Sequence, residues 1–165
     1  MEIRHDPSFD AAFDELFAVA ERVARRVAGA AAAEDIAAEV MGRTLARWSK
    51  VRSLPHRQAW VARVAFHEAL DVSRRQRRQL ERLPVLSSRD LAEDLTTRVM
   101  LNDSLARLPK RQREVVGLRY LADLSEADTA QQVGITVGSV KQHGRRALQS
   151  MRERLDVDRL FEREE

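Results

Sequence analysis

Cysteine is absent from this chain of 165 residues. Without thiols the protein can form neither a disulfide framework nor a thiolate metal site. The histidines (His5, His56, His67 and His143) show no metal-ligand spacing with carboxylates, and there is no glycine-rich loop of the kind that cradles phosphates. The sequence therefore predicts no metal and no cofactor, and it does not support an enzyme that acts on a small-molecule substrate.

Long apolar segments are also missing from the sequence. No run approaches the roughly 20 apolar residues that a membrane-spanning helix needs. The first residues are acidic, whereas a signal peptide begins with basic residues. A cytoplasmic protein that makes no membrane contact is the default expectation.

Glycine, proline and aromatic residues are scarce, with six Gly, four Pro and 5% aromatics. Because Ala, Leu, Arg and Glu are abundant instead, the composition favours an all-α fold. Apolar residues at helical spacing predict helices over about 8–28, 32–48 and 57–78. Gly29 separates the first two helices, and a loop at 50–56 precedes the third.

Helical periodicity is lost over residues 80–92, which predicts a linker. Periodicity resumes near Glu93, and Pro109 is expected to start a further helix. A chain of this length can hold two small domains. We therefore expect two helical domains, 1–79 and 93–165, joined by the short linker 80–92.

The formal net charge of +3 conceals a strong asymmetry along the chain. Residues 1–41 contain four arginines and nine acids, whereas residues 42–80 contain ten Lys or Arg and two acids. The C-terminal part is again mildly basic. Two separated basic surfaces predict contact with nucleic acid at two places.

The segment 108–148 contains two helix-starting signals on either side of one glycine. Ser125 and Thr136 carry hydroxyls of the type that cap helix N-termini. Gly134, between the two helices, suits the left-handed conformation that ends a helix, and Ile135 is then expected to pack into the core. This is the pattern of a helix-turn-helix.

Both helices of this motif are predicted to be amphipathic. The expected apolar positions are Ala127, Ala130 and Val133 in the first, and Val140, Ala147, Leu148, Met151 and Leu155 in the second. Residues 137–152 contain four cations and no acid. A solvated helix usually interleaves both signs, whereas a helix that faces phosphates need not. Although an ordinary surface helix explains a basic face alone, the caps, the glycine turn and the missing acids together predict binding of duplex DNA.

Short strings in both halves of the chain resemble the extracytoplasmic-function (ECF) group of bacterial RNA polymerase sigma factors, in the sigma-70 family. In the C-terminal half the matching strings are Leu108-Pro109, Gln112-Arg113-Glu114-Val115 and Gly134-Ile135-Thr136-Val137-Gly138-Ser139-Val140-Lys141. Response-regulator DNA-binding domains share similar strings. The N-terminal strings Ala33-Glu34-Asp35-Ile36-Ala37-Ala38-Glu39-Val40 and Ala59-Trp60-Val61-Ala62-Arg63-Val64-Ala65-Phe66-His67-Glu68-Ala69-Leu70-Asp71 favour the sigma factors. Ala38 and His67 depart from the family pattern, which usually has Gln and Asn there.

The resemblance implies a non-catalytic promoter-specificity subunit with no cofactor. Its partners would be core RNA polymerase, through the β′ clamp helices and the β flap, and promoter DNA. An anti-sigma factor that clamps between the two halves is common in the family. Residues 1–79 would form region 2 and residues 93–165 region 4.

The resemblance also implies three sets of site residues. Asp35, Glu39 and Arg43 would anchor the polymerase. The melted -10 element would be held by Arg57, Arg63, His67, Arg74 and Arg75. The helix that begins after Thr136 would enter the major groove at the -35 element and present Ser139, Lys141, Gln142, His143, Arg145 and Arg146.

Simpler interpretations stand beside these assignments. Glu34, Asp35 and Glu39 also favour the first half of a helix through its dipole, and they would bind a metal only if another helix added ligands. Trp48 and Trp60 are expected in the core, and His67 fits the core as well as DNA. A stand-alone helix-turn-helix regulator with an N-terminal partner-binding domain is the alternative function.

Overall fold

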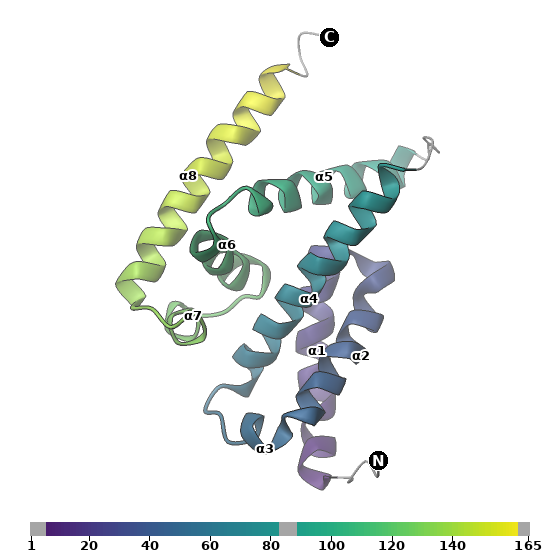
Figure 1. Ribbon diagram of the computed structural model, residues 1–165, viewed down its shortest axis with the longest axis vertical. Helices are drawn as coiled ribbons and strands as arrows, with labels where there is room; N and C mark the ends of the chain where they lie inside the picture. The colour runs from purple at the N-terminus through teal and green to yellow at the C-terminus, as the bar shows by residue number, and fades with distance from the viewer. Residues whose placement is uncertain (1–5, 83–88, 162–165) are drawn as a thin grey trace. The chain divides into compact units, whose positions relative to one another are not determined.

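The computed structural model describes residues 6–82 and 89–161, and side chains over 6–79, 81–82 and 95–154. Within these ranges the chain forms helices and turns and no strand, which confirms the predicted all-α fold. The chain divides into two compact units, residues 1–75 and 76–165. Figure 1 shows the helices along the chain.

The first unit is built from helices α1 (Pro7–Ala28), α2 (Ala30–Ala46) and α3 (Trp48–Val51) and most of α4 (Arg57–Leu80). Asp6 caps α1 by accepting a hydrogen bond from the Ser8 backbone N–H at 2.9 Å. Gly29, at φ 93°, separates α1 from α2 as predicted. The helices α1 and α2 pack against each other over much of their length.

The core of the first unit takes residues from all three long helices. Its largest fully buried side chains include Leu16 and Val23 of α1, Val40 of α2 and Phe66 of α4. Apolar residues at helical spacing thus place one face of each helix inside, and the charged residues are left on the outer faces.

The expected helix 32–48 is interrupted, because α2 ends at Ala46 and a separate turn, α3, begins at Trp48. Trp48 is only 4% exposed, and its indole Nε1 donates to Ser8 Oγ at 2.8 Å. The prediction of a core tryptophan is therefore confirmed for Trp48. It was wrong for Trp60, which is only half-buried.

The second unit contains α5 (Arg89–Ala106), α6 (Lys110–Val116), a π-helical turn η1 (Gly117–Leu121), α7 (Glu126–Val133) and α8 (Val137–Phe161). Helix α8 packs against α6 and α7. The core includes Leu105, Leu118 and Val140, each almost fully buried. No helix in the described ranges is long and apolar enough to cross a membrane.

Two details of this unit correct the sequence-based expectations. Helix α5 begins at Arg89, so the last residues of the segment 80–92 are helical and not an irregular linker. Ala127 and Leu148, expected on apolar faces, are exposed. A helical pattern identifies one side of a helix, but a position is buried only where another element covers it. The side chain of Leu155 lies outside the described residues.

Candidate nucleic-acid and protein interfaces

Helix α7 starts with a side-chain cap. Ser125 Oγ accepts a hydrogen bond from the Asp128 backbone N–H at 3.0 Å, and the Ser125 hydroxyl donates to Asp128 Oδ2 at 2.7 Å. The serine therefore satisfies one of the orphan amides of the first turn, and the aspartate orients the hydroxyl. This confirms the start of the first helix of the motif.

The turn between α7 and α8 follows the predicted geometry. Gly134 is left-handed, at φ 75° and ψ 39°, and its N–H donates to the Ala130 carbonyl oxygen. Ile135 then packs against the buried cluster of Val115, Ala130 and Val140. The turn is thus fixed on its inner side by apolar contact, and this sets the direction in which α8 leaves it.

Helix α8 begins with a second cap. Thr136 Oγ1 accepts from the Ser139 backbone N–H at 3.1 Å and lies 3.0 Å from Ser139 Oγ. The Ser139 hydroxyl, predicted to face DNA, is therefore already engaged at the cap. A DNA contact by Ser139 would require this hydroxyl to share its hydrogen bond with a new partner.

The outer face of α8 exposes Gln142, Arg145 and Arg146. Lys141 is also exposed, and its Nζ lies 3.6 Å from Glu126 Oε2 on α7. His143 is different, because it is partly buried and its Nδ1 is buried without a hydrogen-bond partner in the described part of the chain. Of the six predicted -35 residues, four are thus exposed on α8 and Ser139 lies at its cap. His143 lies at the border between the exposed face and the buried face of the helix.

Gly144 lies on the inner side of α8 and is buried. A Cβ placed on it would meet Val115 Cγ1 of α6 at 3.7 Å, an ordinary van der Waals distance. The glycine is therefore not required by a close approach of the backbones, although it lowers the helix propensity of α8.

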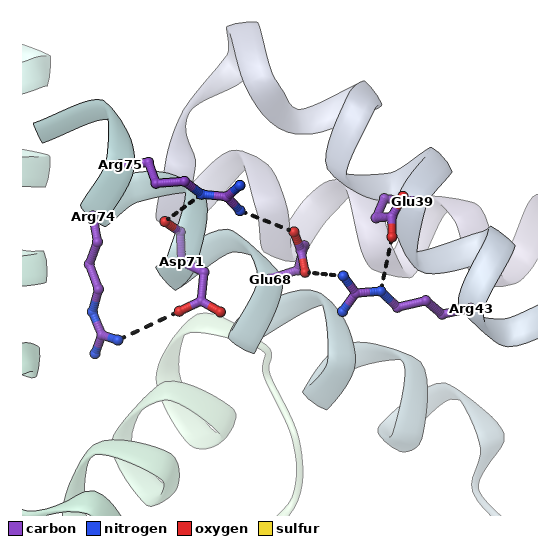
Figure 2. A network of polar contacts seen from close by, with 6 residues as sticks. All are labelled: Glu39, Arg43, Glu68, Asp71, Arg74 and Arg75. Carbon is purple, nitrogen blue, oxygen red and sulfur yellow. Dashed lines mark hydrogen bonds and ion pairs between the residues drawn. The ribbon is translucent and has the colours of Figure 1, made fainter. Parts of the chain in front are cut away.

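The predicted -10 residues lie along α4, and most of their cationic groups face an acid of the same unit. Arg57 Nη2 lies 3.7 Å from Glu15 Oε2 of α1. Arg74 Nη1 lies 3.6 Å from Asp71 Oδ1, and Arg75 Nη2 lies 3.5 Å from Glu68 Oε1 (Figure 2).

The other two predicted -10 residues are less exposed than Arg74 and Arg75. Arg63 and His67 are half-buried, and the His67 ring contacts the Phe66 ring at a centroid distance of 5.7 Å. The structure therefore places His67 at the boundary of the core, between its two expected environments.

The predicted polymerase anchors share one side of α2. Asp35, Glu39 and Arg43 are exposed and follow one another at four-residue intervals. Arg43 Nε donates to Glu39 Oε1 at 3.0 Å, and Arg43 Nη2 contacts Glu68 Oε2 of α4 at 2.7 Å. The hydrogen bond to Glu39, together with the charge of Glu68, raises the pKa of Arg43 above its ordinary value.

Glu68 was missed as a functional candidate in the sequence. It joins α2 to α4, because its two carboxylate oxygens face Arg43 and Arg75 (Figure 2). The signal that pointed to it was available: Glu68 and Asp71 are the two acids within the strongly basic segment 42–80. Around them an open groove of about 620 Å³ lies between α2 and α4, with Ile36 and Val72 among its lining residues.

Comparison with known proteins places the chain in a family. The model of sigma-70 region 4 matches residues 98–151. The RNA polymerase sigma-E factor of Streptomyces coelicolor is 34% identical over 138 residues, which cover 79% of this chain and 78% of that protein. The chain belongs to the ECF group of the sigma-70 family.

Further relatives agree with this assignment. The ECF RNA polymerase sigma factor SigD of Mycobacterium tuberculosis is 30% identical over 131 residues, which cover 73% of this sigma factor and 62% of SigD. A match over 79% of the chain extends well beyond region 4. A stand-alone regulator would share only the C-terminal motif with these sigma factors, so the match would be expected to end within that motif.

Two solved structures share the fold of this sigma factor. The sigma factor RpoE, solved with the anti-sigma factor NepR from Bartonella quintana, gives a TM-score of 0.56 at 19% identity and covers 93% of this chain and 99% of its own. CnrH, solved with the cytosolic domain of CnrY, gives 0.61 at 20% identity, with coverages of 94% and 92%. At these identities the likeness concerns the fold.

Proposed function

We propose that this sigma factor binds core RNA polymerase and directs it to promoters by recognising a -35 and a -10 element. In this proposal the segment 1–79 is region 2, and the segment 93–165 is region 4. The chain supplies specificity, and no catalytic role is assigned to it.

The observation that carries the proposal is the outer face of α8. Helix α8 follows the capped helix α7 and a left-handed glycine turn. Its outer face presents Arg145 and Arg146, and the segment 137–152 contains no acid. An α-helix fits the major groove, where arginine pairs with guanine and glutamine with adenine. Gln142 and the two arginines are therefore the proposed base or phosphate contacts at the -35 element.

The first unit supplies the other two contacts. Arg57, Arg74 and Arg75 offer a cationic track for the backbone of a melted strand, which single-strand binding generally requires. On α2, the exposed carboxylates of Asp35 and Glu39 are suited to basic side chains of the polymerase.

Run-off transcription tests the proposal directly. The full chain is added to core RNA polymerase with fragments of genomic DNA enriched by the reconstituted holoenzyme. We expect transcripts with defined start sites that need both proteins. If no enriched fragment ever supports initiation, the sigma function is wrong for this chain.

A second experiment separates the two surfaces. The double substitution Asp35→Lys with Glu39→Lys should strongly weaken co-purification with core polymerase, because it reverses the charge of the proposed anchor. Binding of the full chain to duplex -35 DNA should stay unchanged, because α8 is untouched. Retention of full polymerase binding would show that the docking surface lies elsewhere.

We also propose an anti-sigma factor as the regulatory partner, since the similar structure of RpoE was solved with the anti-sigma factor NepR. Such a partner must compete with core polymerase for this chain. Once a partner is in hand, a titration of the sigma–polymerase complex should release the polymerase, whereas formation of a stable three-component complex would contradict this mode of control.

A further inference from the structure

Glu68 stands out among the acids of the first unit because it contacts two arginines that belong to different proposed surfaces. Arg43 on α2 belongs to the proposed polymerase surface, and Arg75 on α4 to the proposed -10 track. The Glu68 side chain is 12% exposed, whereas those of Arg43 and Arg75 are 47% and 62% exposed. A carboxylate so removed from water requires a positive partner, while the arginines are accessible to outside groups.

The two contacts are unequal. Arg43 lies 2.7 Å from Glu68 Oε2 and also donates to Glu39 at 3.0 Å, so its planar guanidinium bridges two carboxylates. Arg75 lies 3.5 Å from Glu68 Oε1 and also donates to the Asp71 carbonyl oxygen at 3.3 Å. Figure 2 shows Glu68 between the two arginines, with one carboxylate oxygen turned toward each. Both arginines thus contact the same carboxylate, and the contact with Arg43 is the shorter and stronger one.

We propose that Glu68 is a positioning residue that fixes Arg43 on α2 and masks the charge of Arg75 from DNA. The proposal rests on the proposed function, because it takes Arg75 to be a contact to the melted strand. Arg43 and Arg75 compete for one carboxylate. A change that weakens the Arg43–Glu68 ion pair should therefore strengthen the Glu68–Arg75 ion pair, which makes Arg75 less available to DNA; we call this effect the mask on Arg75. The polymerase surface and the DNA surface are thereby coupled through a single side chain.

This coupling makes two predictions of opposite sign. Glu68→Gln keeps the size of the side chain and removes its charge, so Arg75 becomes available to phosphate. Arg43→Lys keeps the net charge but replaces the guanidinium fork with a compact ammonium, which is less able to bridge Glu39 and Glu68. Glu68 then turns to Arg75, and binding to DNA weakens although residue 43 is not assigned to DNA.

The measurement is the affinity of the full chain for a fluorescein-labelled oligothymidylate, followed by anisotropy over a series of KCl concentrations. We expect Glu68→Gln to tighten binding about two- to fivefold, the range that an exposed ion pair is worth. Its salt dependence should steepen by up to about 0.7 in the logarithmic slope, the contribution of one single-strand phosphate contact. Arg43→Lys should weaken binding by a similar factor.

Matched controls lie on α1, where Arg25 pairs with Glu21 one turn away, as Arg43 pairs with Glu39. Glu21→Gln removes the same negative charge, and Arg25→Lys makes the same change of cation, without touching Glu68. In the Arg75→Ala background, Glu68→Gln should do no more than Glu21→Gln. Thermal melting verifies that each variant is folded, and Arg43→Lys carries the test if Glu68→Gln does not fold.

The outcomes separate the two proposals. If Arg75→Ala weakens binding but Glu68→Gln and Arg43→Lys match their controls, the role of Glu68 is overturned and the -10 track stands. If Arg75→Ala changes neither affinity nor salt slope even in the Glu68→Gln background, Arg75 does not contact the strand, and both the track at this residue and the mask are overturned.

Discussion

Helices α4 and α8 both carry clustered arginines, but the two helices neutralise them differently. On α4, Arg74 and Arg75 face Asp71 and Glu68 on the same helix. On α8, residues 137–152 contain no acid, and Lys141 finds its carboxylate on the neighbouring helix α7. Positive charge on α4 is therefore held in internal pairs, whereas most of it on α8 is open to solvent.

This difference has a physical consequence for DNA binding. An arginine that already has a carboxylate partner must exchange that partner for a phosphate, and the abandoned acid then needs a new counter-ion. An unpaired arginine gains the phosphate without that cost. We infer that α8 is suited to engage duplex DNA directly, while α4 engages a strand only under conditions that favour the exchange.

The largest expected effect tests whether the two units are stable independently. Phe66 is fully buried in the first unit, so Phe66→Ala should cost about 3–5 kcal/mol of folding free energy. Hydrogen exchange of the full chain should show weaker protection in α1, α2 and α4 up to residue 75, with the protection of α6 to α8 retained. Equal weakening in both units would show that they unfold as one, which would break the comparison.

The next effect concerns the open charge on α8. The double substitution Arg145→Ala with Arg146→Ala should weaken binding to duplex DNA roughly tenfold or more and flatten the logarithmic salt slope by about 0.9 for each phosphate that is no longer neutralised. The matched pair is Arg74→Ala with Arg75→Ala, tested on single-stranded DNA, where each arginine should contribute less because an acid already faces it. Because an unpaired contact to a single strand contributes about 0.7 in slope, a loss of that full amount per arginine on α4 would contradict the distinction between paired and open charge.

A smaller effect is expected at the cap of α8. Thr136→Ala removes the acceptor of the Ser139 N–H and should destabilise the second unit by about 1 kcal/mol. Thr136→Ser keeps the hydroxyl and serves as the control. Denaturant unfolding followed by circular dichroism measures the change, and an unaltered midpoint for Thr136→Ala would show that solvent replaces the cap at no cost.

The smallest effect sharpens the account of two glycines in the second unit. Gly144→Ala has room against Val115 and should stabilise α8 by about 0.5–1 kcal/mol through helix propensity. Gly134→Ala should instead destabilise by about 1 kcal/mol, because Gly134 is at φ 75°. Thermal melts of the two variants should therefore shift in opposite directions.

Local features of this sigma factor could be predicted from the sequence, because neighbours along the chain decide them. Ser125, Gly134 and Thr136 each have the side chain, or lack of one, that their backbone position requires. The helix-turn-helix was therefore predictable, together with most helix boundaries.

Features that depend on distant residues could not be predicted. The pairing of Glu68 with Arg43 joins residues 25 positions apart on different helices. Likewise, nothing near Arg47 marks the break before α3, where Trp48 reaches Ser8 at the start of α1. Periodicity also placed Leu148 inside, since a sequence pattern does not show where the neighbouring helices end.

The positions of the two tryptophans give the molecule an optical asymmetry. Trp48 and Trp60, the two in the sequence, both belong to the first unit, whereas the single tyrosine, Tyr120, belongs to the second and is 52% exposed. Excitation at a wavelength that tyrosine does not absorb therefore gives emission from the first unit alone. Intrinsic emission should respond when a single strand occupies α4, close to Trp60, and stay constant when duplex DNA occupies α8, so the unlabelled protein reports which half has bound.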